Sequence, residues 1–258
     1  MKKFIFVHQG VSGEVCEAIN RFGFTVVRLP SFIVLNALIR EHPDSLVFPL
    51  PDGRILLHSD YYGANGAFFD VLGLPVATTD EPIGEKYPDD ILLNALVLGS
   101  TLYGRLDKIS RMITGAYAER VNVKQGYARC SVLALGDNAA VIADRGLAGA
   151  LGSRGVDVLL LPPGGIRLGS GIHAAGKYAD EKYAGGKYAD GGFIGGSGVM
   201  RKFAQLRVML RGDLCGFFGD INGYAHYAEL CEFADAHGVE LVSLGTFPLS
   251  DLGGAVIV

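Results

Sequence analysis

The hydrophobic pattern of the chain repeats in a fixed order. An amphipathic segment ends in glycine, and a short apolar run follows at once. This happens five times, at Gly23, Gly73, Gly115, Gly155 and Gly238. A helix commonly ends in a left-handed residue, and glycine adopts that conformation without a Cβ penalty. Each occurrence therefore predicts a helix followed by a strand, and the chain is predicted to contain five such units.

Two apolar runs also precede the helix in four of the units, which predicts a strand pair. The turns at 51–53 (Pro-Asp-Gly) and 136–138 (Gly-Asp-Asn) favour hairpins. The predicted pairs are 46–50 with 54–58, 91–98 with 100–104, 131–135 with 139–143, and 199–204 with 206–210. Each unit then has the order ββαβ. The first unit lacks a strand, and the terminal run 255–258 is predicted to supply it, which would close a ring and remove two exposed sheet edges.

Aspartates stand just after the second predicted strand of three units, at Asp60, Asp144 and Asp213. One interpretation is that they cap helices by accepting hydrogen bonds from free backbone N–H groups. The other is that equivalent ends of the units converge on one pore, where carboxylates meet a cationic ligand.

Composition narrows the class of protein. The chain has 258 residues, 49% of them hydrophobic, and a net charge of −4. We therefore expect one folded domain over 1–258, and the mild acidity argues against nucleic acid as a partner. The apolar run near the start is too short for a signal peptide, and none is long enough to span a bilayer. A cytoplasmic protein without a membrane partner is expected.

The four cysteines form no C-x-x-C pair and have no histidine at ligand spacing, so neither a metal nor a cofactor is predicted. A glycine-rich, low-complexity insertion occupies about 169–191 and repeats K-Y-A at Lys177, Lys182 and Lys187. A period of five fits neither helix nor strand, which predicts a loop. A lid over the pore and a grip on single-stranded nucleic acid are the alternatives.

Several motifs resemble an uncharacterised bacterial family of the pentein fold, the fold of guanidino-modifying enzymes and amidinotransferases. The motifs are K-Q-G-Y-A-R-C-S (124–131), I-A-D-R-G-L (142–147), G-V-D-V-L-L-L-P-P-G-G-I-R-L (155–168), G-F-I-G-G-S-G (192–198) and L-S-D-L-G-G-A-V-I-V (249–258). The resemblance covers about 90–258 well and the first third loosely. It implies an α/β pentein fold, a five-bladed β/α propeller of ββαβ repeats closed by the C-terminal strand.

Catalytic penteins pair a cysteine near the end of the chain with a histidine and with carboxylates that grip the guanidinium. Here the last cysteine is Cys231, in a predicted helix, and the G-G-D and H-x-D motifs of those enzymes are not recognised in this chain. The ribosome anti-association branch of the fold is not catalytic. The resemblance therefore leaves both an enzyme and a binding module open.

The candidate nucleophile is Cys130, because the neighbouring cations Arg129 and Lys124 would lower its pKa. The alternative is a buried strand cysteine with Arg129 on the opposite face. Asp251 and Asp213 are the candidate carboxylates for gripping a cation, although Asp251 would equally satisfy a turn.

The remaining candidates are ligand-binding residues. Gly126 would let a ligand approach Gln125 closely, Asp144 would face the pore, and Ser197 lies in a glycine-rich loop suited to an anion. His8 and His173 are the histidines placed to reach a pore.

Two functions are predicted from these residues. The first is a cysteine-dependent hydrolase or transferase acting on a small guanidino, amidine or amide compound in the central channel. The alternative is a non-catalytic binding module for a metabolite or a protein partner, and a homodimer is left open.

Overall fold

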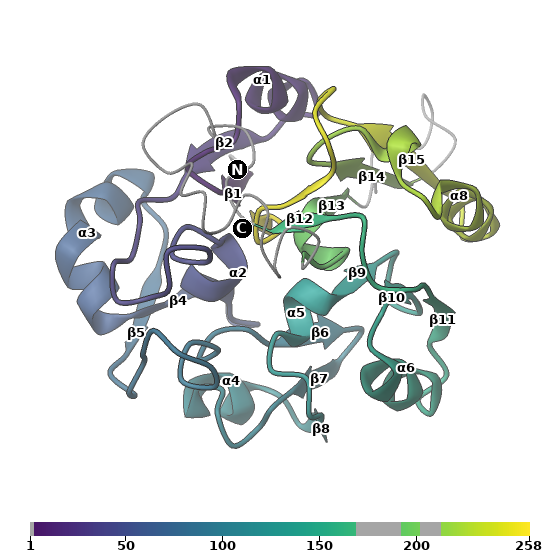
Figure 1. Ribbon diagram of the computed structural model, residues 1–258. Helices are drawn as coiled ribbons and strands as arrows, with labels where there is room; N and C mark the ends of the chain where they lie inside the picture. The colour runs from purple at the N-terminus through teal and green to yellow at the C-terminus, as the bar shows by residue number, and fades with distance from the viewer. Residues whose placement is uncertain (1–2, 169–191, 202–212) are drawn as a thin grey trace.

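The structure, a computed structural model, describes residues 3–168, 192–201 and 213–258. It is a mixed α/β fold in which five separate three-stranded sheets have the same strand order. In each sheet the middle strand pairs antiparallel with one neighbour and parallel with the other. Figure 1 shows the sheets set around a common centre, near which α2, α5 and the C-terminus lie.

The first three sheets are built from the following strands and helices. Sheet one contains β17 (Val256–Ile257), β1 (Phe4–Val7) and β2 (Thr25–Arg28), with α1 (Gly13–Arg21) between β1 and β2. Sheet two contains β3 (Phe48–Pro49), β4 (Ile55–His58) and β5 (Val76–Thr79), with α2 (Pro43–Leu46) before β3 and α3 (Ser59–Leu72) after β4. Sheet three contains β6 (Leu96–Leu98), β7 (Thr101–Gly104) and β8 (Glu119–Asn122), with α4 (Arg111–Ala116).

The other two sheets follow the same order. Sheet four contains β9 (Val132–Ala134), β10 (Ala139–Ile142) and β11 (Asp157–Leu160), with α5 (Ala128–Ser131) before β9 and α6 (Arg145–Gly152) after β10. Sheet five contains β13 (Gly198–Arg201), β14 (Asp213–Phe217) and β15 (Val239–Ser243), with the 3₁₀ turns η1 (Gly195–Ser197) and η2 (Ile221–Gly223) and the helix α8 (Tyr227–Ala236). A further pair joins β12 (Arg167–Leu168) to β16 (Ser250–Asp251).

The terminal strand joins the first sheet, as predicted. Ile257 pairs with Ile5 and Val256 with Phe6 in an antiparallel register. Backbone hydrogen bonds of 3.0 Å run in both directions between Phe4 and Val258. The last residues of the chain therefore supply the strand that the first unit lacks.

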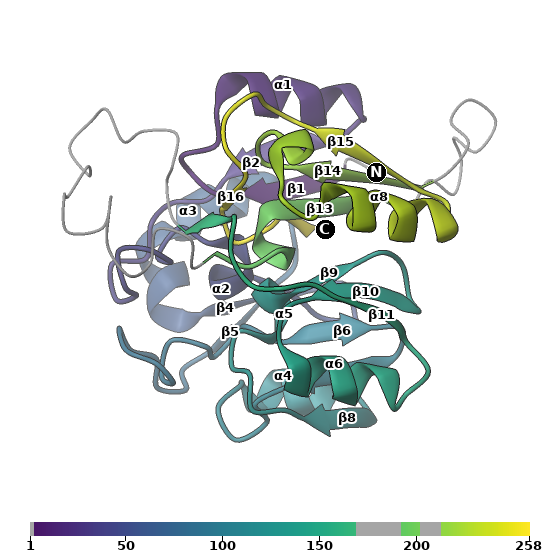
Figure 2. The same cartoon turned by 45° about the vertical axis from the view of Figure 1, so that its right-hand side comes forward.

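Apolar side chains fill the spaces between neighbouring sheets and their helices. One cluster combines Phe6, Val27 and Val256 of sheet one with Ile55 and Leu57 of sheet two. Figure 2 shows α6 packed along the outside of β10 and β11, so the helices flank the sheets and the strands approach the centre. No helix in the described ranges has the length and hydrophobicity needed to cross a membrane.

Three local predictions are wrong. Ser131 belongs to α5, so the strand predicted over 131–135 begins at Val132. Gly115 lies inside α4, whereas Gly23, Gly73, Gly155 and Gly238 have the positive φ expected. The partner of β13 is β14, not the predicted 206–210, which lies outside the described residues.

The last of these errors displaces a candidate site residue. Asp213 opens β14 instead of following a strand, and its backbone N–H donates to Gly238 O at 3.1 Å. The predicted insertion at 169–191, with its K-Y-A repeats and His173, also lies outside the described residues.

Candidate functional site

Five segments that precede the first strand of each sheet meet at the centre of the molecule. They are α2 before β3, the turn holding Asn94 before β6, α5 before β9, η1 before β13 and the turn 251–254 before β17. Direct hydrogen bonds join them. Arg129 N donates to Asn94 Oδ1 at 3.0 Å, and Gly254 N donates to Gly196 O at 2.8 Å. Side chains from distant parts of the chain are thereby brought together.

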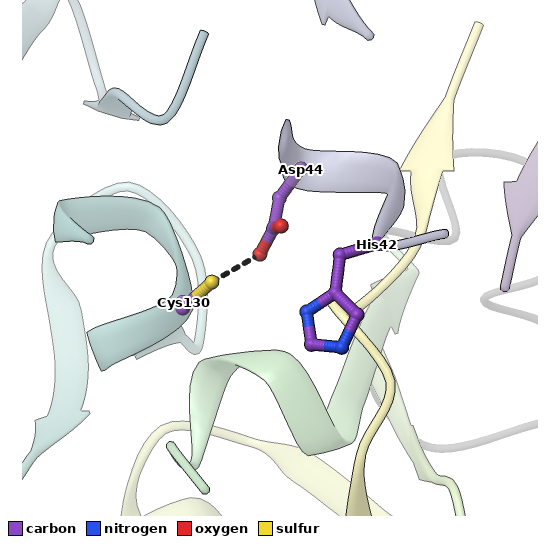
Figure 3. Close-up of side chains that lie close together, drawn as sticks. All are labelled: His42, Asp44 and Cys130. Atoms are coloured by element: carbon purple, nitrogen blue, oxygen red, sulfur yellow. Dashed lines mark hydrogen bonds between the residues drawn. The ribbon is translucent and has the colours of Figure 1, made fainter. Parts of the chain in front are cut away.

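Cys130 lies at the middle of this assembly and is only 4% exposed. Its Sγ is 2.6 Å from Asp44 Oδ2, a contact in which the thiol donates to the carboxylate. The side-chain amide of Asn94 donates to the same sulfur at 3.3 Å. Figure 3 shows Cys130 and Asp44 facing each other from two short helices, α5 and α2, with His42 beside them.

His42 completes the group without a hydrogen bond of its own. It is 1% exposed, and within the described residues neither ring nitrogen has a hydrogen-bond partner. Its Nδ1 is 3.9 Å from Asp251 Oδ1, and its ring packs edge-on against His8 with 5.7 Å between centroids. Ligand atoms of His42, Asp44 and Cys130 all lie within 4.8 Å of one another.

Asp251 is held by the backbone and leaves no room around it. It accepts hydrogen bonds from Phe193 N at 2.8 Å and Gly253 N at 3.0 Å. A Cβ on Gly196 would overlap the Asp251 carboxylate. Glycine is therefore required there by the close approach of that side chain.

Burial dominates the electrostatics of the group. It raises the pKa of the Cys130 thiol well above its ordinary value, and the charges of Asp44 and Asp251 raise it further. Burial also raises the pKa of Asp44 to about 6, although the hydrogen bond from Cys130 and the charge of Arg129 act to lower it. Burial raises the pKa of Asp251 to about 7. Burial, followed by the charge of His8, lowers the pKa of His42.

The expected lowering of the Cys130 pKa is therefore wrong, because burial and the charges of Asp44 and Asp251 outweigh the charge of Arg129, which acts on the thiol in the expected direction. The guanidinium of Arg129 donates at 3.4 Å to Val47 O, and Lys124 is exposed on the surface. The prediction that Cys130 sits in a strand is wrong too, because α5 carries it. At neutral pH the thiol keeps its proton and shares it with Asp44.

A cavity of about 410 Å³, here called the axial cavity, lies beside this group. The first strand of every sheet contributes to its wall, through Pro49, Leu96, Val132, Gly198 and Ile257. Asp44 and Arg129 are the charged residues of the lining. Cys130 lies behind Asp44 and outside the lining.

The other predicted residues are spread more widely. Gln125 and Asp144 line a second cavity of about 240 Å³, where their side chains lie 3.5 Å apart. Asp144 also caps α6 by accepting from Leu147 N at 2.7 Å, which confirms the capping interpretation. At Asp60 that interpretation is wrong, because His58 caps α3.

Ser197 is fully buried and donates to Ile194 O at 2.8 Å. Asp213 lies at the start of β14, whereas the cluster forms at the segments that precede first strands. The structure therefore brings together Cys130, Arg129 and Asp251 from the predicted set, and it separates Lys124 and Asp213 from them.

Sequence reasoning missed His42, Asp44 and Asn94. A signal for two of them was present, because His42-Pro43-Asp44 is an H-x-D triplet of the kind that was not recognised. Asn94 stands within the apolar run I-L-L-N-A-L, where a polar residue at a buried position calls for a partner.

Comparisons with known proteins show the family to which the chain belongs. Residues 6–173 match the sequence profile of a family of unknown function, DUF6873. The match includes the first third of the chain, where the resemblance based on sequence motifs is loose. None of the curated proteins matches the sequence significantly.

Solved structures of the pentein type are similar to the chain over most of its length. A mutant of DDAH from Pseudomonas aeruginosa in complex with citrulline has 12% identity and a TM-score of 0.49, with 95% of this chain and 93% of that one covered. SxtG, an amidinotransferase of the saxitoxin pathway from Microseira wollei, has 10% identity and a TM-score of 0.46, covering 96% and 93%. The inosamine-phosphate amidinotransferase StrB1 from Streptomyces griseus has 10% identity and a TM-score of 0.45, covering 97% and 90%. At these identities and scores, nothing about activity follows.

Proposed function

We propose, for a chain that belongs to the DUF6873 family of unknown function, that the axial cavity binds a small compound with a guanidino, amidine or amide group. The observation that carries this proposal is the placement of a carboxylate and a guanidinium, Asp44 and Arg129, on the wall of one cavity of about 410 Å³. That volume is in the range of small-molecule sites.

The two charged groups suit the two ends of such a compound. A carboxylate accepts paired hydrogen bonds from a planar amidinium or guanidinium, and an arginine donates to an acidic group. Apolar strand residues such as Leu96 and Val132 line the wall between the ends and would pack against the stem of the compound. A ligand with a cationic head and an acidic tail therefore fits the cavity best.

Calorimetric titration tests the binding. The ligands are arginine, agmatine and acetamidine, with lysine as a cation of different shape. We expect at least one planar cation to bind, Asp44→Asn to weaken it at least about 10-fold, and lysine to bind more weakly. Asp60→Asn is the matched control because Asp60 is exposed. If no compound of the class binds, or Asp44→Asn binds as tightly as the native chain, the proposal fails.

A second candidate function is the cysteine-dependent hydrolase or transferase. One observation favours it: the carboxylate that lines the cavity is also the one that contacts Cys130 Sγ, at 2.6 Å. Asp44 would take the thiol proton and would have to turn aside, because Cys130 lies behind it, and the sulfur would then add to the guanidinium carbon. The amine would leave with a proton, and water would cleave the C–S bond and restore the thiol.

Release of ammonia or amine from the same compounds tests this second function. We expect turnover to be lost in Cys130→Ser and to persist in Cys215→Ala, which removes a buried thiol that does not line the cavity. Binding without turnover would leave the first function standing and rule out the second. Turnover that survives in Cys130→Ser would rule out Cys130 as the nucleophile.

The shared strand order of the five sheets supports a further proposal, that the whole chain is one domain arranged as a five-bladed propeller. Each sheet contributes its first strand to the wall of one cavity, as blades around an axis would. The cytoplasmic location and the homodimer stay predictions.

A further inference from the structure

The polar group behind the cavity is short of hydrogen-bond partners. His42 is 1% exposed, and neither ring nitrogen is hydrogen-bonded within the described residues. A buried polar group without a partner destabilises the folded chain. One of its ring nitrogens faces Asp44 and Cys130 (Figure 3). An imidazole nitrogen, a carboxylate and a thiol that face one another could all bind the same metal ion.

From this arrangement we infer that His42, Asp44 and Cys130 form a binding site for a divalent zinc ion. One ligand atom from each side chain lies within 4.8 Å of the others. A thiolate, an imidazole and a carboxylate are the protein ligands that Zn²⁺ takes. The thiolate and imidazole disfavour Mg²⁺ and Ca²⁺, and the carboxylate disfavours Cu⁺.

The contact between sulfur and carboxylate has to open for the ion to enter. Cys130 Sγ and Asp44 Oδ2 are 2.6 Å apart. Tetrahedral coordination with Zn–S near 2.3 Å and Zn–O near 2.1 Å separates the two ligand atoms by about 3.6 Å. The ion would replace the thiol proton that the two atoms share, and that proton would be released to solvent.

Two neighbours are placed to orient these ligands. The amide of Asn94 donates to Cys130 Sγ at 3.3 Å, and N–H···S bonds of this kind support a metal-bound thiolate. Asp251 Oδ1 is 3.9 Å from His42 Nδ1. This is the same nitrogen that faces Asp44 and Cys130 (Figure 3), so Asp251 stands beside the ligand atom itself and limits how the ring can turn. Because Asp44 lines the axial cavity, the ion can arrive by that route.

The ion would tie together parts of the chain that are far apart in sequence. His42 and Asp44 belong to the segment before β3, and Cys130 to the segment before β9. The zinc site shares Asp44 with the proposed ligand, whereas His42 and Cys130 belong to the zinc site alone, because neither of them lines the cavity. Loss of His42 or Cys130 should therefore remove zinc and leave the guanidino compound bound.

The experiment uses the full chain, purified with a chelator and then titrated with Zn²⁺ and with Co²⁺ as a spectroscopic substitute. We expect one Zn²⁺ per chain in competition with a chromophoric chelator, and a thiolate-to-Co²⁺ charge-transfer band. Cys130→Ser should abolish the band and weaken Zn²⁺ at least about 100-fold, and His42→Gln should weaken it similarly. Asn94→Ala should weaken it by about 10–100-fold.

Cys231→Ser combined with His226→Gln is the matched control, because this pair removes a cysteine and a histidine on and beside α8, far from the cluster. It should bind Zn²⁺ as the native chain does. Circular dichroism checks that each variant is folded, and Asn94→Ala and Asp44→Asn replace any variant that is not. The inference is overturned if the native chain takes up no stoichiometric Zn²⁺, if Cys130→Ser retains it, or if only the control loses it.

Discussion

Two clusters of polar side chains, one around Glu81 and one around Asp44, differ in how completely their carboxylates are hydrogen-bonded. Glu81 follows β5 and accepts hydrogen bonds from Ser110 Oγ, from Thr79 Oγ1 at 2.9 Å, and from Arg111 N at 3.0 Å and Nε at 3.1 Å. Burial disfavours its ionised form, but these donors together lower its pKa. The carboxylate is thus ionised and fully satisfied.

Asp44 is more deeply buried, with 2% of its surface exposed against 16% for the Glu81 side chain, and it has fewer donors. Cys130 donates to one oxygen, and Ser45 Oγ donates to the other at 3.3 Å. Its pKa rises to about 6. The ring nitrogens of the neighbouring His42 have no hydrogen-bond partner among the described residues. The Glu81 cluster is complete within the protein, whereas the Asp44 cluster lacks partners and borders a cavity.

The comparison teaches how to separate structure from function among buried polar groups. A satisfied network stabilises the fold, and its removal costs free energy of unfolding. A network that lacks partners contributes little until a ligand completes it. Substitutions in the two clusters should therefore change the free energy of unfolding by different amounts and in different directions.

The largest effect is expected at Gly196, beside the Asp44 cluster. Gly196→Ala puts a methyl group into the Asp251 carboxylate, and overpacking a filled interior costs about 1–3 kcal/mol or more. The carboxylate would also lose its fit to Phe193 N and Gly253 N, so we expect a loss of at least about 3 kcal/mol in the urea unfolding free energy.

Gly149→Ala is the control for that substitution. Gly149 lies in α6, where an added Cβ meets nothing within 4 Å. Alanine there should stabilise the helix by about 0.5–1 kcal/mol. A tolerated Gly196→Ala would show that the cluster has room for another side chain, and the contrast between the clusters would weaken.

Two of the three buried cysteines, Cys130 and Cys215, provide the next test. Cys215 packs among apolar side chains of sheet five, so the hydroxyl of Cys215→Ser would lack a partner and cost about 1–3 kcal/mol. In Cys130→Ser the hydroxyl keeps Asp44 as acceptor and Asn94 as donor, and we expect a loss below about 1 kcal/mol. Both are measured by urea unfolding in a chelator. Equal losses would mean that Cys130 is not in a polar setting.

Much of the fold, and part of this cluster, could be predicted from the sequence. The glycine-terminated helices and the terminal strand were visible because local spacing and end residues decide them. Cys130 and Asp251 stood out because their immediate neighbours are unusual. The partners of Cys130 could not be found this way, because Asn94 is 36 residues away and Asp44 is 86 residues away.

The misplaced strand of sheet five has a different physical cause. Residues 206–210 alternate in the manner of a strand, whereas β14 contains Gly216, a residue that normally weakens a strand. Packing overrides the propensity there, because a Cβ on Gly216 would come within 2.9 Å of Leu244. The need for glycine at position 216 depends on β15 and the loop after it, and no local sequence pattern reveals such a distant contact. Asp213 was therefore predicted to follow the second strand, although it begins that strand.

Glu81→Gln sharpens the comparison through its dependence on pH. The amide loses the ionic part of the bonds to Ser110 and Arg111, and we expect a loss of about 1–2 kcal/mol at pH 7. Because the folded pKa is lowered, the stabilisation is complete above the ordinary glutamate value of about 4.3 and is lost as pH falls through the folded value. The difference between the variant and the native chain should therefore vanish in acid.

Urea unfolding between pH 3 and 8 measures that difference. Asp60→Asn, at an exposed carboxylate near the same sheet, should change little at any pH. A difference that grows as pH falls would contradict the lowered pKa of Glu81, and the first cluster would then resemble the second.

The smallest change in unfolding free energy is expected at His42. Whether this change is stabilising or destabilising decides if the two clusters differ. His42→Leu removes two ring nitrogens that make no hydrogen bond among the described residues, and it keeps an apolar side chain in the space. Removing unsatisfied polar groups is close to neutral or stabilising. In the presence of a chelator we expect a change between zero and about 1 kcal/mol in favour of the folded chain.

His58→Leu is the matched control, because His58 is equally buried but bonded through both ring nitrogens. Its Nδ1 accepts from Asp60 N at 3.2 Å, and its Nε2 lies 3.1 Å from Glu81 O. Loss of this helix cap should cost about 1–2 kcal/mol. If His42→Leu costs as much as His58→Leu in the chelated protein, His42 is bonded in solution and the two clusters are alike. If His42→Leu loses no stability in the chelated protein, and if added Zn²⁺ stabilises the native chain but not this variant, the missing partner of His42 is the ion.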